Sequence, residues 1–230
     1  MNLLALDTST EVFSIAVQRG GAAPLQQQGP GGANASAALI PAIQDLLARS
    51  GLALAGLDAI VFGRGPGSFT GLRTACAVAQ GLAFGADLPV LAVDTLLAVA
   101  EQARGSSGVT RVVAMLDARM DEVYAAAYEW SGAAWQERQG VAVQAPQRVQ
   151  VPAGWAMAGN VFAPYGERLP GGVRVEALPS AAALLRLAPA LLAAGRAGPA
   201  AAAIPLYIRD KVAQTTEERA AARALTSPSP

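Results

Sequence analysis

The sequence contains no histidine and a single cysteine, and these two scarcities exclude whole classes of catalytic site. Without histidine the chain has no Ser-His-Asp or Cys-His nucleophile pair and no histidine-ligated metal. One cysteine, Cys76, excludes an internal disulfide and any multi-cysteine metal site. Cys76 falls in an apolar helical pattern, where a buried, unreactive thiol is expected. Carboxylates remain as side chains that can bind Mg²⁺.

Charge is also sparse. Seventeen basic and 17 acidic residues leave a formal net charge of zero, and only 15% of residues are charged. Proteins that bind nucleic acid need basic surface to neutralise phosphates, so this composition argues against a chain that holds RNA by itself. A hydrophobic content of 53% over 230 residues predicts a globular chain with a sizeable core.

Long hydrophobic runs are lacking as well. The alanine-rich stretch 181–203 is interrupted by Arg186, Pro189 and Arg196, and the opening MNLLALDTST turns polar after six residues. We therefore expect neither a transmembrane span nor a signal peptide. A cytoplasmic location is the resulting expectation.

The most distinctive segment is GRGPGSFTGLR, residues 63–73, with four glycines and a proline before an apolar helical pattern. Such a loop allows close backbone approach, and free N–H groups at a helix start can bind an anion. It lacks the Gly-Lys-Ser/Thr of a P-loop. Ser68 or Thr70 is predicted to cap the helix. The segment could serve a phosphate, a partner chain or the fold.

Two arginines of this segment are candidates for specific contacts. A cation in the first turn of a helix is poorly placed for the helix dipole, so Arg73 is expected to pair with an anion or with an acidic group of a partner. Arg64 is a candidate for the same kind of contact.

Hydrophobic periodicity predicts alternating strands and helices. Strands are predicted at 2–7, 11–18, 58–62, 88–93, 111–117, 121–130, 155–159 and 173–177, and helices at 36–50, about 70–85, 94–104 and 180–194. Residues 20–34, rich in Gly, Pro and Gln, are predicted to form a loop or a short, poorly defined strand.

The two halves of the sequence open alike, because LDTSTEVFSIA at 6–16 resembles LDARMDEVYAAA at 116–127. The match pairs Asp7 with Asp117, Glu11 with Glu122, Val12 with Val123 and Phe13 with Tyr124, with one residue added in the second turn. Both copies form a strand–turn–strand at the start of a half. A duplicated α/β domain is the economical interpretation.

Asp7 ends a predicted buried strand and precedes Thr8, Ser9 and Thr10. Actin-like phosphotransferases place an acid in such a turn to meet a nucleotide phosphate and its Mg²⁺. The alternative is a turn carboxylate that accepts backbone N–H bonds. Asp117, with Arg119 as a partner, leaves the same two interpretations open.

Five segments are distinctive when taken together: LLALDTST, GRGPGSFTGLR, AQGLAFG (79–85), LDARMDEVY (116–124) and PLYIRDKVAQ (205–214). They resemble the TsaB (YeaZ) family, accessory subunits in the biosynthesis of threonylcarbamoyladenosine (t6A) in tRNA. The resemblance implies an α/β, actin-like ATPase (ASKHA, RNase H-like) fold with two duplicated βββαβαβα-type subdomains. It divides the chain into residues 1–108 with partner-binding helices, residues 109–214, and a flexible tail at 215–230.

The resemblance implies a scaffold. The paralogue TsaD transfers the threonylcarbamoyl group onto A37 of tRNAs that read ANN codons, and it holds a metal through a histidine pair that this sequence lacks. The implied partners are TsaD and TsaE, with tRNA contacted only through the complex, no membrane, and a homodimer when TsaD is absent. No cofactor is implied for this chain alone, and ATP with Mg²⁺ is left to the assembled complex.

The helices predicted at 36–50 and 70–85 carry many alanines and few charges, which is typical of a helix that buries a second face. Together with the resemblance they give the candidate partner interface: Ser36, Leu39, Ile40, Ile43, Leu47, Thr70, Arg73, Thr74, Ala77, Val78 and Gly81. The degenerate phosphate-loop positions are Asp7, Thr8, Ser9, Thr10, Asp117 and Arg119.

Two other functions compete with the scaffold. An autonomous actin-fold ATPase or kinase would use Asp7 and Asp117 around Mg²⁺, but DTSTE and DARMD contain no glycine where backbone must approach phosphate. A peptidase would need a nucleophile–base pair, and the sequence contains none. The glycine loop is thus predicted mainly as a turn that presents the helix at 70–85 to a partner, with Arg73 the residue to test for an anion.

Overall fold

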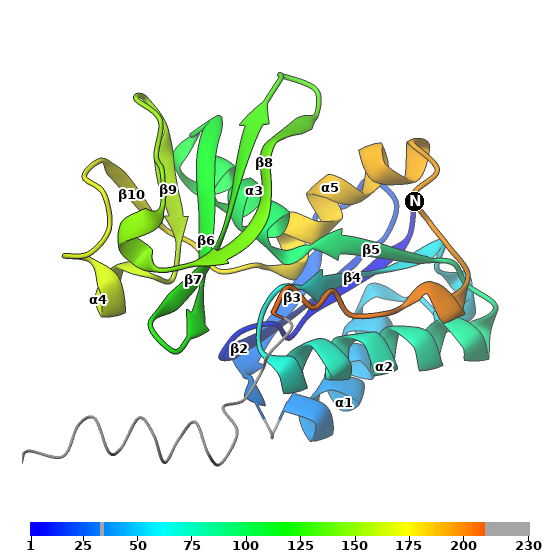
Figure 1. Ribbon diagram of the computed structural model, residues 1–230. Coiled ribbons are helices and arrows are strands. Elements are labelled where there is room, and N and C mark those ends of the chain that lie inside the picture. Colours follow the sequence, from blue (N-terminus) through cyan, green and yellow to red (C-terminus); the bar gives the residue numbers. More distant parts are fainter. Residues whose placement is uncertain (33–34, 210–230) are drawn as a thin grey trace, which may run out of the picture.

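The computed structural model describes residues 1–32 and 35–209, which form two halves, each built on a mixed sheet (Figure 1). The first sheet contains β1 (Leu3–Asp7), β2 (Val12–Gln18), β3 (Leu25–Pro30), β4 (Ala59–Gly65) and β5 (Val90–Asp94). Their order is β3-β2-β1-β4-β5. β1, β2 and β3 are antiparallel neighbours, whereas β4 and β5 run parallel to β1.

The second sheet repeats this connectivity. It contains β6 (Arg111–Arg119), β7 (Glu122–Trp130), β8 (Trp135–Gln144), β9 (Ala156–Gly159) and β10 (Val173–Glu176), in the order β10-β9-β6-β7-β8. The duplicated α/β architecture is therefore confirmed. β8 was not predicted, and β3 was predicted only as a loop or short strand. Both are edge strands with little apolar alternation, which weakens their sequence signal.

The helices lie in different places in the two halves. α1 (Ala35–Ser50) and α2 (Phe69–Ala86) cover one face of the first sheet, and η2 (Leu54–Gly56) follows α1. The corresponding positions of the second half hold the short η3 (Pro146–Arg148) and α4 (Phe162–Tyr165). The predicted α/β alternation is thus present throughout, but the second half has much shorter helices on its outer face.

α3 (Thr95–Ser107) and α5 (Ala181–Ala193) join the halves. α3 follows the first sheet but packs on β6, whereas α5 follows the second sheet but packs on β1 and β2. η4 (Ala200–Ala202) then returns to α2. The predicted boundary at residue 108 stays a prediction, because each half contributes a helix to the other. Residues 210–214 and the predicted tail at 215–230 lie outside the described residues.

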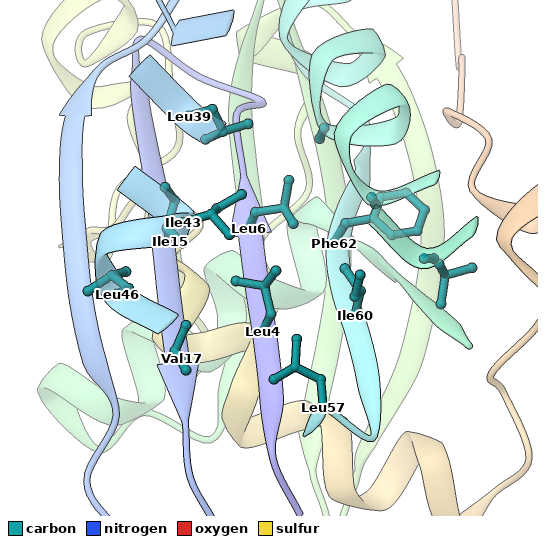
Figure 2. Close-up of a cluster of buried hydrophobic side chains, with 14 of the residues drawn as sticks. Leu4, Leu6, Ile15, Val17, Leu39, Ile43, Leu46, Leu57, Ile60 and Phe62 are labelled. Carbon is teal, nitrogen blue, oxygen red and sulfur yellow. The ribbon is translucent and has the colours of Figure 1, made fainter. Parts of the chain in front are cut away.

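The core of the first half corrects part of the predicted interface (Figure 2). Leu39 and Ile43 of α1 point toward Leu6 and Ile15 of the sheet, and Leu47, one turn further along α1, is buried in the same cluster. These three side chains recur every four residues, so they form the buried stripe of an amphipathic helix. They are core residues and not surface residues.

The repeat is correct in topology, but its predicted residue match is wrong in register. Asp7 pairs across the hairpin with Ser14, seven positions away, whereas Asp117 pairs with Val123, six positions away. The longer connection therefore belongs to the first half, not to the second as the sequence match predicts.

The two aspartates also point to different faces of their sheets. Side chains alternate along a strand, so Asp7 shares its face with Ala5, which packs toward α5 between the sheets. Asp117 shares its face with Met115, on the outer side where Tyr165 of α4 lies. The two acids are therefore not structurally equivalent. Within residues 1–32 and 35–209, every helix is too short or too polar to cross a membrane.

Candidate functional site

The glycine loop at 63–71 lies directly on the turn that follows β1. Thr8 donates its hydroxyl hydrogen bond to the carbonyl of Gly71 at 2.6 Å, and the Ser68 N–H donates to the carbonyl of Ser9 at 2.7 Å. A Cβ on Gly71 would lie 1.8 Å from the Thr8 oxygen, and one on Gly67 would lie 2.5 Å from the Ser9 oxygen. Glycine is needed because the chain's own backbone makes the close approach.

The other predicted features of this loop also find partners within the chain. Of the two predicted caps, Ser68 and Thr70, the structure has Ser68 as the N-cap of α2, and its hydroxyl accepts a hydrogen bond from the Gly71 N–H. Arg64 pairs with Asp94. Arg73 lies 3.9 Å above the ring of Phe69 and donates to the hydroxyl of Tyr207 at 2.9 Å. Arg73 therefore contacts two aromatic side chains of the chain itself, and its pairing with an anion or an acidic group of a partner stays a prediction.

Asp7 is completely buried. One carboxylate oxygen accepts hydrogen bonds from the Ser9 N–H at 2.9 Å and the Ser9 hydroxyl at 2.6 Å. The other oxygen has no hydrogen-bond partner among the described residues, and it lies where a Cβ on Gly63 would be 1.8 Å away. Burial raises the pKa of Asp7 although the bonds from Ser9 act in the opposite direction. A metal–phosphate group needs a carboxylate oxygen it can reach, so Asp7 does not fit that role.

Asp117 is more accessible but is already engaged. It forms a salt bridge with Arg119 at 3.1 Å and accepts hydrogen bonds from the Arg119 N–H and the Tyr165 hydroxyl, each at 2.8 Å. The backbone N–H of Asp117 donates to the Asn160 side chain at 3.0 Å. Burial, followed by the bond to Asp117, raises the pKa of Tyr165 to about 12. The predicted pairing of Asp117 with Arg119 is confirmed.

A cavity of about 730 Å³ lies between the two halves. We call it the inter-half cavity. Its walls include Ser9, Thr10, Gly67, Ser68, Phe69, Asp117, Arg119, Met120, Tyr124, Asn160, Tyr207 and Arg209. Of the predicted phosphate-loop positions, Ser9, Thr10, Asp117 and Arg119 line this cavity, whereas Asp7 and Thr8 are buried behind the glycine loop.

The exposed face of α2 carries much of the remaining predicted interface. Thr70, Arg73, Ala77 and Gly81 are exposed along it, and Phe84, which was not predicted, is 83% exposed. Thr74, Val78 and Ile40 are half-buried, and the side chain of Ser36 lies outside the described part of the chain. Cys76 is on the opposite, buried side, where burial raises its thiol pKa to about 11.

One polar centre was not predicted. The carboxylate of Glu101 on α3 is 1% exposed and accepts hydrogen bonds from Arg104, Trp135 and Arg186. Burial would raise the pKa of Glu101, but these bonds together hold it below its ordinary value. The residues come from α3, β8 and α5, so the cluster joins the halves. An acid inside an apolar helix was the only signal in the sequence.

Two sheets of the same order around an inter-half cavity define a protein of the actin-like, RNase H-like fold class. Residues 16–170 match the TsaD family, tRNA N6-adenosine threonylcarbamoyltransferase. The tRNA threonylcarbamoyladenosine biosynthesis protein TsaB of Escherichia coli strain K12 is 35% identical over 93% of this chain and 96% of its own length. The corresponding protein of Haemophilus influenzae is 48% identical over 54% of this chain and 52% of its own length.

A solved structure of this family is similar to the chain as well. YeaZ from Pseudomonas aeruginosa is 43% identical with a TM-score of 0.84, covering 90% of this chain and 99% of that one. The chain therefore belongs to the TsaB family.

Proposed function

We propose that this chain is a non-catalytic accessory subunit for threonylcarbamoyl transfer to A37 of tRNA, and that it docks a TsaD-type transferase. Membership of the TsaB family supports the pathway. The observation that supports the non-catalytic role is that Asp7 is completely buried beneath the chain's own loop, while Asp117 is engaged by Arg119 and Tyr165. These two residues were the candidates for holding a nucleotide.

The exposed face of α2 is the proposed docking surface. Ala77 and Gly81 are small, so a partner helix can approach closely, and the open ring of Phe84 offers an aromatic anchor of the kind that dominates interface energies. Arg73 adds a charged donor at the start of the same face. In the free chain we propose that a second copy covers this surface, which gives a homodimer.

The remaining assignments are proposals of the same kind. TsaE joins the complex, and tRNA is held by the complex because the chain has no net positive charge. The chain requires no cofactor of its own, ATP and Mg²⁺ binding to the assembled complex, and it works in the cytoplasm.

Reconstitution tests the proposed function. TsaC, TsaD, TsaE, ATP, threonine, bicarbonate and tRNA are combined with and without this chain, and t6A is measured in the digested tRNA. We expect modification only when the chain is present. Full modification in its absence would rule out the accessory role.

A matched pair of glycine variants tests the docking surface. A Cβ built on Gly81, or on Gly171, which is exposed in the second half, would meet no described atom within 4 Å beyond its chain neighbours and the backbone of its own helix. Gly81→Arg should keep or raise helix stability, because arginine is the better helix former. It should weaken TsaD binding at least tenfold in calorimetry and dissociate the homodimer, whereas Gly171→Arg should change neither.

An ATPase assay tests the alternative of an autonomous ATPase or kinase. We expect no turnover by the purified chain with ATP and Mg²⁺. Turnover that Asp7→Ala abolishes would support the alternative and contradict the non-catalytic assignment.

A further inference from the structure

The segment that follows η4, residues 204–209, is here called the strap. It is first fixed to the first half (Figure 1, orange), where it runs alongside α2. Ahead of it, Gly198 exchanges two backbone hydrogen bonds with Val90, each 2.9 Å long, and Ala203 is buried in the core of the first half. The Leu206 N–H then donates to the carbonyl of Arg64 at 2.7 Å.

Two further contacts hold the strap at this place. A Cβ on Gly65 would lie 2.7 Å from the Leu206 carbonyl oxygen, so the glycine leaves room for the strap to pass. Tyr207 packs against Phe69 with ring centroids 5.4 Å apart, and its hydroxyl accepts the hydrogen bond from Arg73. The strap is therefore bonded to the glycine loop and to the first turns of α2.

Two residues further along, the strap reaches the second half. Arg209 forms a salt bridge with Glu122 at the start of β7. It also contacts the turn between β6 and β7, at 3.5 Å from the Arg119 carbonyl oxygen and 3.1 Å from the Met120 sulfur. The Arg209 side chain is only 13% exposed. A mostly buried arginine with three partners on one turn is well fixed, unlike a surface ion pair.

Strap residues from Leu206 to Arg209 also line the inter-half cavity. We propose that the strap is a restraint that holds the two halves together across this cavity, with the Arg209–Glu122 pair as its attachment to the second half. In an actin-like enzyme a bound nucleotide bridges the halves at such a place. Here the chain's own residues make the bridge, in agreement with the poor fit of Asp7 to a metal–phosphate group. The proposal is independent of the proposed docking to TsaD.

Charge reversal tests the strap in the full-length chain. Ala48 on α1 and Glu167 beyond α4 are exposed positions in different halves, and replacing both by cysteine allows spin labels to report the distance between the halves. Cys76 is buried and should stay unlabelled. Pulsed electron resonance then compares the labelled parent with Arg209→Glu, Glu122→Arg and the double reversal.

We expect each single reversal to lengthen and broaden the distance distribution, and the double reversal to restore the parent distribution. Arg138→Glu is the matched control, because Arg138 pairs with Glu129 inside the second half; it should leave the distances unchanged. Circular dichroism confirms folding, and Arg209→Gln replaces Arg209→Glu if the reversed variant does not fold. Unchanged distances in the single variants, or a double variant that stays open, would overturn the proposal.

Discussion

The turn after β1 and the turn after β6 have related sequences, but the first is buried and the second is exposed. In the first half the glycine loop covers residues 8–10, and Thr8 and Ser9 are buried under it. In the second half the turn at 119–121 is exposed, with the Arg119 side chain 83% accessible. The difference follows from the helices: α2 begins over the first turn, whereas its counterpart is the four-residue α4.

The backbone of the two turns reflects this difference. Arg119, Met120 and Asp121 all adopt left-handed backbone conformations, at φ of 61°, 55° and 59°. A two-residue hairpin turn requires such angles at its central residues, here Met120 and Asp121, and Arg119 adopts one at the irregularity that ends β6. Side chains other than glycine adopt these angles at a cost. The covered turn avoids that cost because its longer connection is stabilised by hydrogen bonds to Asp7 and to the glycine loop. A turn without a covering helix therefore depends on its own geometry and on the strap.

The largest effect is expected from opening the covered turn. Gly71→Ala places a methyl group against the Thr8 carbonyl, and neither backbone can move without breaking the contact between loop and turn. We expect a loss of about 3 kcal/mol or more in the free energy of unfolding, measured in urea. Gly81→Ala in the same helix is the control and should gain about 1 kcal/mol. Equal effects of the two variants would contradict the close approach.

The second effect concerns Glu101, which holds the two differently built halves together. Glu101→Gln leaves Arg104 and Arg186 without their buried carboxylate, so we expect the free energy of unfolding to fall by about 2 kcal/mol at neutral pH. Glu129→Gln is the control, because Glu129 also binds two arginines but on the surface; its effect should be clearly smaller.

The pKa of Glu101 adds a pH dependence to this prediction. Because the folded pKa is lowered, the stabilisation by Glu101 is present above the unfolded value of about 4.3 and is lost as the pH falls through the folded value. Denaturation curves at several acidic pH values should show that the difference in free energy of unfolding between wild type and Glu101→Gln becomes smaller as the pH falls. A difference that grows in acid would be evidence against a stabilising, ionised Glu101.

A third, smaller effect distinguishes a structural Asp7 from a ligand-binding one. The folded pKa of Asp7 is raised, so its contribution to stability is complete below about pH 4 and is lost as the pH rises through the folded value. The free energy of unfolding of Asp7→Asn should therefore exceed that of the wild type by about 1 kcal/mol at pH 7, and it should depend less on pH above pH 4. Thermal unfolding of the variant across this range is the measurement.

Asp117→Asn is the matched variant in the exposed turn. Asp117 pairs with a mostly exposed arginine, so removing this ion pair should lower the free energy of unfolding by less than about 1 kcal/mol.

A large loss of stability at neutral pH for Asp7→Asn would contradict the interpretation that burial disfavours the ionised form of Asp7 in the covered turn.

The smallest effect is expected in the exposed turn. Asp121→Gly places a glycine where φ is 59°. This should raise the free energy of unfolding by about 0.5–1 kcal/mol, because glycine adopts a left-handed conformation without strain. Ser9→Gly in the covered turn should instead lower the free energy of unfolding, because it removes the hydroxyl that donates to Asp7 and leaves only the bond from the backbone N–H. Differential scanning calorimetry of the pair measures both changes. A gain in both turns would show that the covered turn is strained as well.

Local patterns predicted most of the fold. Alternating and helical periodicity located β1, β2, β4 and β5 and the helices α1 to α3, because their apolar stripes are continuous. The edge strand β8 escaped prediction because many of its residues are polar and none of them is buried. Leu39 and Ile43 were placed at a surface because a sequence shows that a stripe is apolar but not which layer covers it.

The sequence by itself determined the fold class, the presence of a repeat, the buried thiol and the family. Each of these can be read from local hydrophobic patterns or from short motifs, whereas the choice of Ser68 over Thr70 as the helix cap needed the structure. Only the tertiary structure decided that the glycines serve the chain's own turn, that Asp7 and Asp117 face different sides, and that Arg209 and Glu101 join the halves. The physical reason is that burial and charge pairing depend on neighbours tens of residues away, which pattern and spacing do not reveal.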